Sequence, residues 1–121
     1  MAVKWYRVYL ERLPWNRAKE RCVAVGGQFA IVPDESTWAF IKSLSPADLW
    51  LGGTDEATEG IWKWVDGTPL TFTAWLGAGP DNSGGNENYI VTRTKGWNDV
   101  PKHGNFGAFH AVGFICEWKA K

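Results

Sequence analysis

The sequence has few of the residues that mark several classes of protein. Its two cysteines, Cys22 and Cys116, lie near opposite ends of the chain, far from a Cys-x-x-Cys metal spacing. Its two histidines, His103 and His110, have no third nitrogen or sulfur ligand beside them, so we do not expect a zinc site. Thirteen basic and thirteen acidic residues cancel, and no block of Lys or Arg occurs. Nucleic acid is therefore not an expected partner.

Long apolar runs are absent as well. No stretch approaches the roughly 18 apolar residues of a membrane span, so we expect no membrane insertion. The first residues, Met1 to Tyr6, lack the apolar run of a signal peptide. We therefore expect a mature domain, and a module of a larger protein.

The chain does have enough apolar residues to bury a core. With 45% hydrophobic residues over 121 positions, it is expected to form a single domain over residues 1–121. Nine tryptophans are unusual for this length. A ring that large is either a core filler or an exposed platform for a ligand, and we expect Trp62, Trp64 and Trp97 in the core.

Two helices are predicted in the first half of the chain. Residues 14–25 start with a proline, contain good helix formers and end at a Gly-Gly pair, with Cys22 on the apolar face. A second helix follows, with Asp34 or Ser36 as its N-cap. Short strands are predicted at residues 4–10 and, in the second half, at residues 49–51, 62–65, 89–92 and 113–118, and residues 29–32 form a short buried run between the helices. Strands that follow helices indicate an α+β domain.

A long polar loop, residues 72–88, carries the most informative chemistry. It contains Gly79-Pro80-Asp81-Asn82 and then Glu87-Asn88, and Trp97-Asn98-Asp99 follows it. These segments supply carboxylate and amide oxygens, and Ca²⁺ takes about six to eight oxygen ligands. The sequence therefore predicts a calcium loop. The alternative, that Asp, Asn, Gly and Ser only form turns here, stays open.

Several motifs together resemble the C-type lectin-like domain over nearly the whole chain. In chain order they are Trp15-Asn16-Arg17-Ala18, Cys22, Gly26-Gly27, Leu49-Trp50-Leu51-Gly52, Gly60-Ile61-Trp62-Lys63-Trp64-Val65-Asp66-Gly67, Trp97-Asn98-Asp99 and Gly113-Phe114-Ile115-Cys116-Glu117. The resemblance implies an α+β C-type lectin-like fold with two helices, two small antiparallel sheets and a long ligand-binding loop. It also implies that the N- and C-terminal strands pair and that Cys22 bonds Cys116. A disulfide of this kind persists in an oxidising compartment, so we expect a secreted or extracellular protein.

The resemblance also assigns calcium ligands. The principal site would use Asp81, Glu87, Asn98 and Asp99, with Pro80 as a cis-proline. Gly79 stands where family members have a ligand side chain, so one coordination bond is missing. A second site would use Asp55, Glu59, Asn82 and Asn88, with the backbone carbonyl of Glu87. Asn82 and Asn88 stand where acids are more usual, which implies weaker Ca²⁺ binding. The alternative for this second group is a solvated loop whose acids only cap turns.

The implied function is calcium-dependent carbohydrate binding. Ca²⁺ would hold two vicinal sugar hydroxyls, and the principal ligands would hydrogen-bond the same hydroxyls. Pro80-Asp81 is similar to the Gln-Pro-Asp of galactose-binding members rather than the Glu-Pro-Asn of mannose-binding ones. A ring under the sugar would come from Phe106, Phe109 or Trp75.

Two further departures from the family pattern concern the loop. The inner disulfide is absent, with Tyr89 where its first cysteine would be, so the loop must be held by packing of Tyr89 or by metal, and the segment between Asp99 and Cys116 is long. Gly79, Asn82 and Asn88 leave a rival function open. The rival is a calcium-independent lectin-like domain that binds a protein through the long loop and residues 100–112. An enzyme is not expected, because no nucleophile-base arrangement can be read. The sequence alone does not specify the sugar, the oligomeric state or the parent protein.

Overall fold

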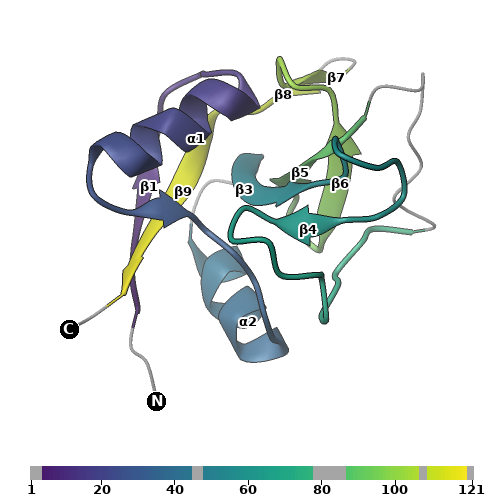
Figure 1. Cartoon of the computed structure of the whole chain (residues 1–121), viewed down its shortest axis with the longest axis horizontal. Helices are drawn as coiled ribbons and strands as arrows, with labels where there is room; N and C mark the ends of the chain where they lie inside the picture. Colours follow the sequence, from purple (N-terminus) through teal and green to yellow (C-terminus); the bar gives the residue numbers. More distant parts are fainter. Residues whose placement is uncertain (1–3, 45–47, 78–86, 107–108, 120–121) are drawn as a thin grey trace.

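The computed structural model describes residues 4–44, 48–77, 87–106 and 109–119. Strand β1 (Lys4–Tyr9) opens this part of the chain and strand β9 (Gly113–Lys119) closes it. The two strands pair antiparallel from Lys4 opposite Lys119 to Tyr9 opposite Phe114, so both chain ends lie at one end of the molecule (Figure 1). The expected pairing of the terminal strands is confirmed.

Both expected helices are present, and the residues that flank them account for where they begin or end. Helix α1 (Trp15–Ala24) follows Pro14, whose fixed φ suits the entry to a helix, and stops before Gly26, which has a φ of 85°. Helix α2 (Glu35–Ser43) is capped by Asp34, whose Oδ1 accepts a hydrogen bond from the Thr37 backbone N–H at 2.8 Å. Of the two N-cap candidates, Asp34 is therefore the one used.

The described strands form one mixed sheet and one small hairpin. The sheet runs in the order β1-β9-β3-β5-β6, with β2 paired to β9 and β4 to β3, and β7 pairs with β8 separately. The remaining bounds are β2 Gln28–Phe29, β3 Leu49–Thr54, β4 Lys63–Trp64, β5 Tyr89–Thr92, β6 Trp97–Val100, β7 Asn105–Phe106 and β8 Phe109–His110.

The α+β class and the lectin-like fold are confirmed, but the strands are joined differently from the two small antiparallel sheets that the resemblance implied. Leu49 and Trp50 of β3 pair parallel with Gly113 and Phe114 of β9. On its other side β3 pairs antiparallel with β5. Because β3 has partners on both sides, the terminal strands and the strands near the long loop belong to one continuous sheet.

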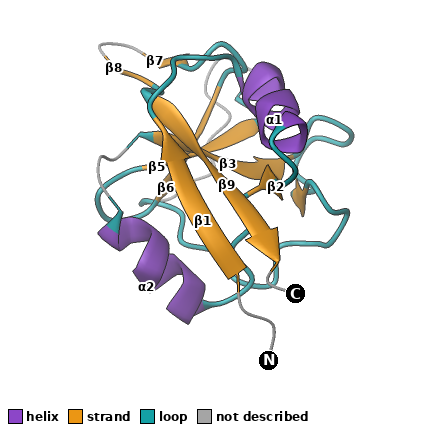
Figure 2. Cartoon of the chain, turned by 90° about the vertical axis from the view of Figure 1, so that its left-hand side faces the viewer, coloured by secondary structure: helices purple, strands orange, loops and turns teal. Residues whose placement is uncertain are grey.

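Two hydrophobic clusters lie on the two faces of this sheet. Helix α1 covers one face and α2 the other (Figures 1 and 2). The cluster on the α1 side includes Trp15, Trp50 and Phe114, and the cluster on the α2 side includes Ile41 and Ile115. Neighbouring residues of one strand enter opposite clusters, as the two-residue period of a strand requires. Neither described helix has the length and apolar character needed to cross a membrane.

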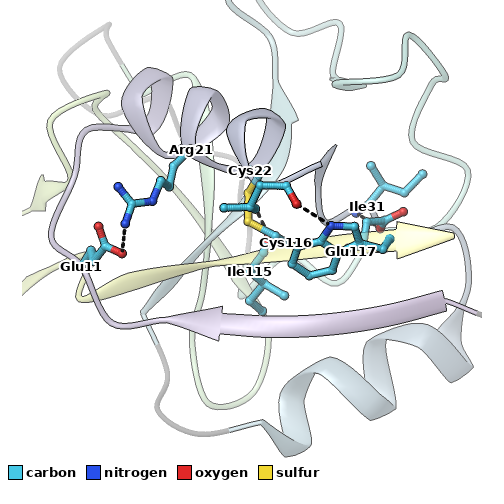
Figure 3. The surroundings of a disulfide bond; sticks show 9 residues. Glu11, Arg21, Cys22, Ile31, Ile115, Cys116 and Glu117 are labelled. Atoms are coloured by element: carbon cyan, nitrogen blue, oxygen red, sulfur yellow. Dashed lines mark hydrogen bonds and ion pairs between the residues drawn. A yellow bond between two sulfur atoms is a disulfide. The ribbon is translucent and has the colours of Figure 1, made fainter. Parts of the chain in front are cut away.

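The cysteines join α1 to β9 by a disulfide, as the resemblance implied (Figure 3). Cys22 lies on the buried face of α1, and Cys116 lies opposite Arg7 of β1 and Phe29 of β2. Both residues have no exposed surface. The bond therefore ties the first helix to the centre of the terminal strands.

Tryptophan rings account for much of the cluster on the α2 side. The buried Trp97 ring makes edge contacts with Trp38, Trp64 and Trp75 at centroid distances of 5.9, 5.6 and 5.6 Å. The core positions expected for Trp64 and Trp97 are confirmed. The core position expected for Trp62 is wrong: Trp62 is only half-buried and packs at the edge of this cluster against the half-buried Trp75.

A buried carboxylate ties the two terminal strands to the segment after β2. Glu117 is 1% exposed, its Oε1 accepts from the Ile31 backbone N–H at 2.8 Å, and its Oε2 lies 3.0 Å from Lys4 Nζ. Removing one partner of a buried ion pair leaves an uncompensated charge.

We expect Lys4→Met to lower the free energy of unfolding by about 2 kcal/mol, below the full cost for a buried pair because Lys4 remains partly exposed. Urea denaturation measures the change. Lys95→Met, at an exposed loop position, is the matched control with no expected effect. Adding Glu117→Gln to Lys4→Met should recover part of the loss, since it removes the unpaired charge. Equal stability of Lys4→Met and the control would contradict this role for the pair.

The N-cap of α2 makes a pH-dependent contribution to stability. Hydrogen bonds from the side chain and then the backbone of Thr37 lower the pKa of Asp34 below its ordinary value of 3.8. A carboxyl whose pKa is lower in the folded state stabilises the fold above its unfolded pKa and loses that effect as the pH falls through the folded value.

We therefore expect Asp34→Ala to lower the thermal midpoint at neutral pH, and the difference from the parent to shrink below about pH 4. Melting curves across this range provide the measurement. Asp34→Asn should retain most of the stability at neutral pH, because an asparagine also caps helices well. A difference between Asp34→Ala and the parent that stays constant with pH would contradict the prediction.

Candidate functional site

An acidic loop follows strand β3 and folds back on the residue that precedes β5. The Asp55 backbone N–H and the Thr54 hydroxyl both donate to the Asn88 backbone carbonyl, at 3.2 and 2.6 Å. Asp55 is 2% exposed, and its Oδ2 accepts from the Gly60 backbone N–H at 2.8 Å. These bonds fix Asp55 between the loop and the start of β5.

The side chain of Asn88 links two of the acids. With its amide nitrogen facing the carboxylates, Asn88 donates to Asp55 Oδ1 at 2.9 Å and to Glu59 Oε1 at 3.1 Å. Asp55, Glu59 and Asn88, three residues of the expected second calcium site, are therefore in direct contact. We call them the acidic cluster. The side-chain carbonyl oxygen of an asparagine can also coordinate a cation, and it faces the carboxylates when the amide group is flipped.

Within the described residues, no ion pair joins Asp55 or Glu59 of the acidic cluster to a lysine or arginine. The hydrogen bond with Asp55 raises the pKa of Glu59 above its ordinary value of 4.5, and burial and the charges of Asp55 and Asp99 raise it further. Like charges close together disfavour ionisation. The charge of Asp99, on another strand, thus also acts on the acidic cluster.

Asn98 and Asp99 lie on β6, the last strand of the sheet path. Asn98 pairs with Val91 and Asp99 with Ile90 of β5, and β5 begins directly after Glu87 and Asn88. Asp99 is 1% exposed and Asn98 half-buried. The pairing of β5 with β6 therefore brings the Trp-Asn-Asp motif to the sheet edge that also receives the end of the long loop.

Tyr89 and Glu56 form a contact that sequence reasoning only half anticipated. Packing of Tyr89 was expected, and its ring is buried with its centroid 4.7 Å from that of Trp15. In addition, the Tyr89 hydroxyl donates to Glu56 Oε2 at 2.5 Å, and burial followed by this hydrogen bond raises the pKa of the phenol. No spacing in the sequence pairs position 56 with position 89. The contact anchors the acidic loop to the start of β5.

Several expected site residues lie outside the described residues. They are Gly79, Pro80, Asp81 and Asn82 of the long loop. The backbones of Phe106 and Phe109 pair with one another in the β7-β8 hairpin. Across residues 4–44, 48–77, 87–106 and 109–119, no group of three or more His, Cys, Asp and Glu side chains is arranged to hold a metal ion. The acidic cluster itself consists of two acids, Asp55 and Glu59, in contact with one amide, Asn88.

The fold and the comparisons with known proteins place the chain among lectin-like domains rather than enzymes. The chain belongs to the lectin C-type domain family, whose model matches residues 11–108. Among curated relatives it is 35% identical over 105 residues to the C-type lectin domain family 4 member F of Mus musculus, covering 79% of this chain and 19% of the relative. It is 36% identical over 99 residues to the hepatic lectin of Gallus gallus, covering 78% and 48%. The chain therefore spans less than half the length of these relatives.

Solved structures agree on the fold. The carbohydrate-recognition domain of the mouse scavenger receptor C-type lectin superimposes with a TM-score of 0.84 and 26% identity, over 98% of this chain and 90% of that one. A Ca²⁺-dependent type II antifreeze protein in its Ca²⁺-free form superimposes with a TM-score of 0.79 and 30% identity, over 95% and 91%. The same fold thus occurs in a carbohydrate-recognition domain and in an antifreeze protein.

Proposed function

We propose that this chain is a calcium-dependent carbohydrate-binding domain. The observation that carries the proposal is the acidic cluster, in which Asp55 and Glu59 share one amide and the pKa of Glu59 is raised by neighbouring negative charge. A divalent cation would relieve this repulsion, and carboxylate and amide oxygens are the ligands that Ca²⁺ prefers. Membership in the lectin C-type family supports the same reading.

Two cation positions are proposed, with the residues expected from the sequence. The principal one uses Asp81, Glu87, Asn98 and Asp99, and the second uses Asp55, Glu59, Asn82 and Asn88. The effect of the Asp99 charge on Glu59 supports two positions that share the end of the long loop. The principal position needs Asp81 and the second needs Asn82, so both positions depend on the long loop.

The sugar would bind at the principal position. Ca²⁺ would hold two vicinal hydroxyls, and Glu87 and Asp99 would accept hydrogen bonds that Asn98 complements by donating. A galactose-type sugar is proposed only because Pro80-Asp81 is similar to the motif of galactose-binding members. Phe106 or Phe109 would supply the ring under the sugar. Single contacts of this kind are weak, so useful binding would require several domains acting together.

A calcium titration tests the cation. We expect millimolar Ca²⁺ to raise the thermal midpoint, and Mg²⁺ to do so less, because a ligand that binds only the folded state stabilises it. Binding to a glycan array with and without chelator then tests the sugar. An unchanged midpoint in calcium, or glycan binding that survives chelator, would contradict the proposal.

The second candidate is a calcium-independent domain that binds a protein through the long loop and residues 100–112. The absence of a side chain at Gly79 favours it, as do Asn82 and Asn88 at positions where acids are more usual. It predicts that chelator leaves partner binding unchanged. In either case we propose that residues 1–121 form one domain of a secreted or extracellular protein, which the disulfide supports.

A further inference from the structure

The acidic loop is attached to the start of β5 at two points. At the first, the Thr54 hydroxyl and the Asp55 backbone N–H donate to the Asn88 backbone carbonyl, at 2.6 and 3.2 Å. At the second, the Tyr89 hydroxyl donates to Glu56 Oε2 at 2.5 Å. The buried Asp55 adjoins both points, because it bonds Asn88 itself and precedes Glu56 in the chain. Both attachments therefore act on members of the acidic cluster.

The packing of the Tyr89 ring fixes the position of its hydroxyl. Tyr89 is 4% exposed, and its ring centroid lies 4.7 Å from that of Trp15 at the start of α1. The Lys102 ammonium lies 5.7 Å from the Tyr89 ring centroid, and the Lys102 backbone carbonyl accepts from the Trp15 backbone N–H at 2.8 Å. A side chain that packing holds in this way can position the group to which it bonds.

Glu56, by contrast, is exposed. Its backbone N–H donates to the Thr54 hydroxyl at 3.0 Å, so its main chain belongs to the same bonded turn as the first attachment. Holding an exposed side chain in one conformation costs entropy that a contact must offset. A hydrogen bond to an ionised carboxylate is roughly twice as strong as one between neutral groups. The Tyr89 hydroxyl can therefore hold Glu56, and the loop backbone with it, against β5.

Negative charge opposes the closure of this loop. Asp55, Glu56 and Glu59 follow one another closely in the sequence, and within the described residues no ion pair joins any of them to a lysine or arginine. Like charges close together repel. Without a bound cation, the loop depends on its hydrogen bonds to β5. A site that is ordered in advance binds more tightly, because the entropy of ordering it is not lost on binding.

We propose that Tyr89 and Glu56 are positioning residues for the acidic cluster. Their hydrogen bond holds the acidic loop against β5, and so keeps Asp55 and Asn88 in place before a cation binds. Neither residue belongs to the proposed ligand sets. The consequence for calcium affinity rests on the proposed function, whereas the ordering of the loop does not. Residues that support metal ligands in this way typically contribute about 10- to 100-fold to metal affinity.

Tyr89→Phe tests the ordering of the loop, because it removes one hydroxyl and keeps the packed ring. Backbone ¹⁵N relaxation is measured in chelator, where calcium plays no part. In the parent we expect order parameters of about 0.85 for the Glu56 and Gly60 amides, and in Tyr89→Phe values below about 0.6. The Val91 amide of β5 should keep its value. A uniform loss of stability would leave all three values unchanged in the folded chain.

Tyr6→Phe is the matched control for the relaxation measurement. It removes a hydroxyl from the other face of the sheet, where the Tyr6 ring contacts Phe40 at a centroid distance of 5.3 Å. It should leave the order parameters of the acidic loop at the parent's values. Unchanged order parameters in Tyr89→Phe, or an equal fall in Tyr6→Phe, would overturn the proposal whether or not the chain binds calcium.

Calcium titration of the folded variants tests the effect on the cation site. Tyr89→Phe and Glu56→Ala should each raise the calcium concentration at half-saturation about tenfold. Glu56→Gln should stay within about twofold of the parent, because its side-chain oxygen still accepts from the Tyr89 hydroxyl. Glu56→Ala and Glu56→Gln remove the same charge, so a difference between them reports the hydrogen bond.

The outcomes separate this proposal from the calcium proposal. A loosened loop with unchanged calcium affinity in Tyr89→Phe would overturn the positioning role, as would equal losses of affinity in Glu56→Gln and Glu56→Ala. Absence of calcium binding by the parent would contradict the proposed function instead, and the order parameters alone would then decide whether Tyr89 and Glu56 hold the loop.

Discussion

Asp99→Asn is expected to abolish calcium-dependent glycan binding and to raise the calcium concentration at half-saturation by about 100-fold or more. Under the proposed function Asp99 is a direct ligand of the principal cation, and its charge also acts on Glu59 of the acidic cluster. Even residues that only support a metal ligand typically cost about 10- to 100-fold in metal affinity when they are changed. A direct ligand should cost at least as much.

The substitution is chosen to separate binding from folding. Asp99 is 1% exposed within β6, so a smaller residue would leave a cavity, whereas asparagine keeps the shape of the side chain. Thermal melting in chelator reports whether the variant is folded, and the midpoint shift on adding calcium reports binding. Glu35→Gln, which removes an exposed charge at the start of α2, is the control. Calcium binding by Asp99→Asn at the parent's concentration would remove Asp99 from the ligand set.

Replacing both cysteines, as Cys22→Ala with Cys116→Ala, is expected to lower the free energy of unfolding by about 4 to 5 kcal/mol. The bond closes a loop with a sequence separation of 94, and on the chain-entropy account a closed loop of about this length stabilises a fold by that amount. Since small domains have a total free energy of unfolding of only about 5 to 15 kcal/mol, about a quarter or more of the stability would be lost.

Urea denaturation of the parent, the reduced parent and the double variant measures this effect. The chain has two cysteines in all, so a reductant acts on this bond alone. We expect the reduced parent to unfold near the midpoint of the double variant, and the double variant to be insensitive to reductant. A double variant as stable as the oxidised parent would show that contacts of β9 with β1 and β2 alone hold the ends of the chain together.

Helix α1 and strand β1 show how far the sequence predicts this fold. The proline, the apolar spacing and the Gly-Gly pair of residues 14–27 act within a few positions of one another, so the bounds of α1 follow closely from local rules. The alternation of residues 4–10 likewise predicts β1. The parallel pairing of β3 with β9 could not be predicted in this way, because it joins Leu49 to Gly113 and depends on which faces the two helices cover.

The sequence likewise predicted one part of the acidic cluster and not another. The residue types Asp55, Glu59 and Asn88 were predicted as a group from the resemblance, because oxygen-bearing side chains can be read from the chain. Their mutual contact was not readable, since it depends on Thr54 pairing with Tyr89 in the β3-β5 ladder. The hydrogen bond between Tyr89 and Glu56, which anchors the acidic loop, depends on the same pairing of β3 with β5.

By itself the sequence determined the local elements, the balance of charge, the supply of oxygen ligands and the family resemblance. These depend on side-chain chemistry and on spacings of a few residues, which can be read from the sequence without knowing the fold. Only the tertiary structure decided the continuous mixed sheet, the contact among Asp55, Glu59 and Asn88, and the hydrogen bond of Tyr89 with Glu56. Each of these joins segments tens of residues apart, and such contacts form only when packing of the whole core repays the entropy of closing the chain between them.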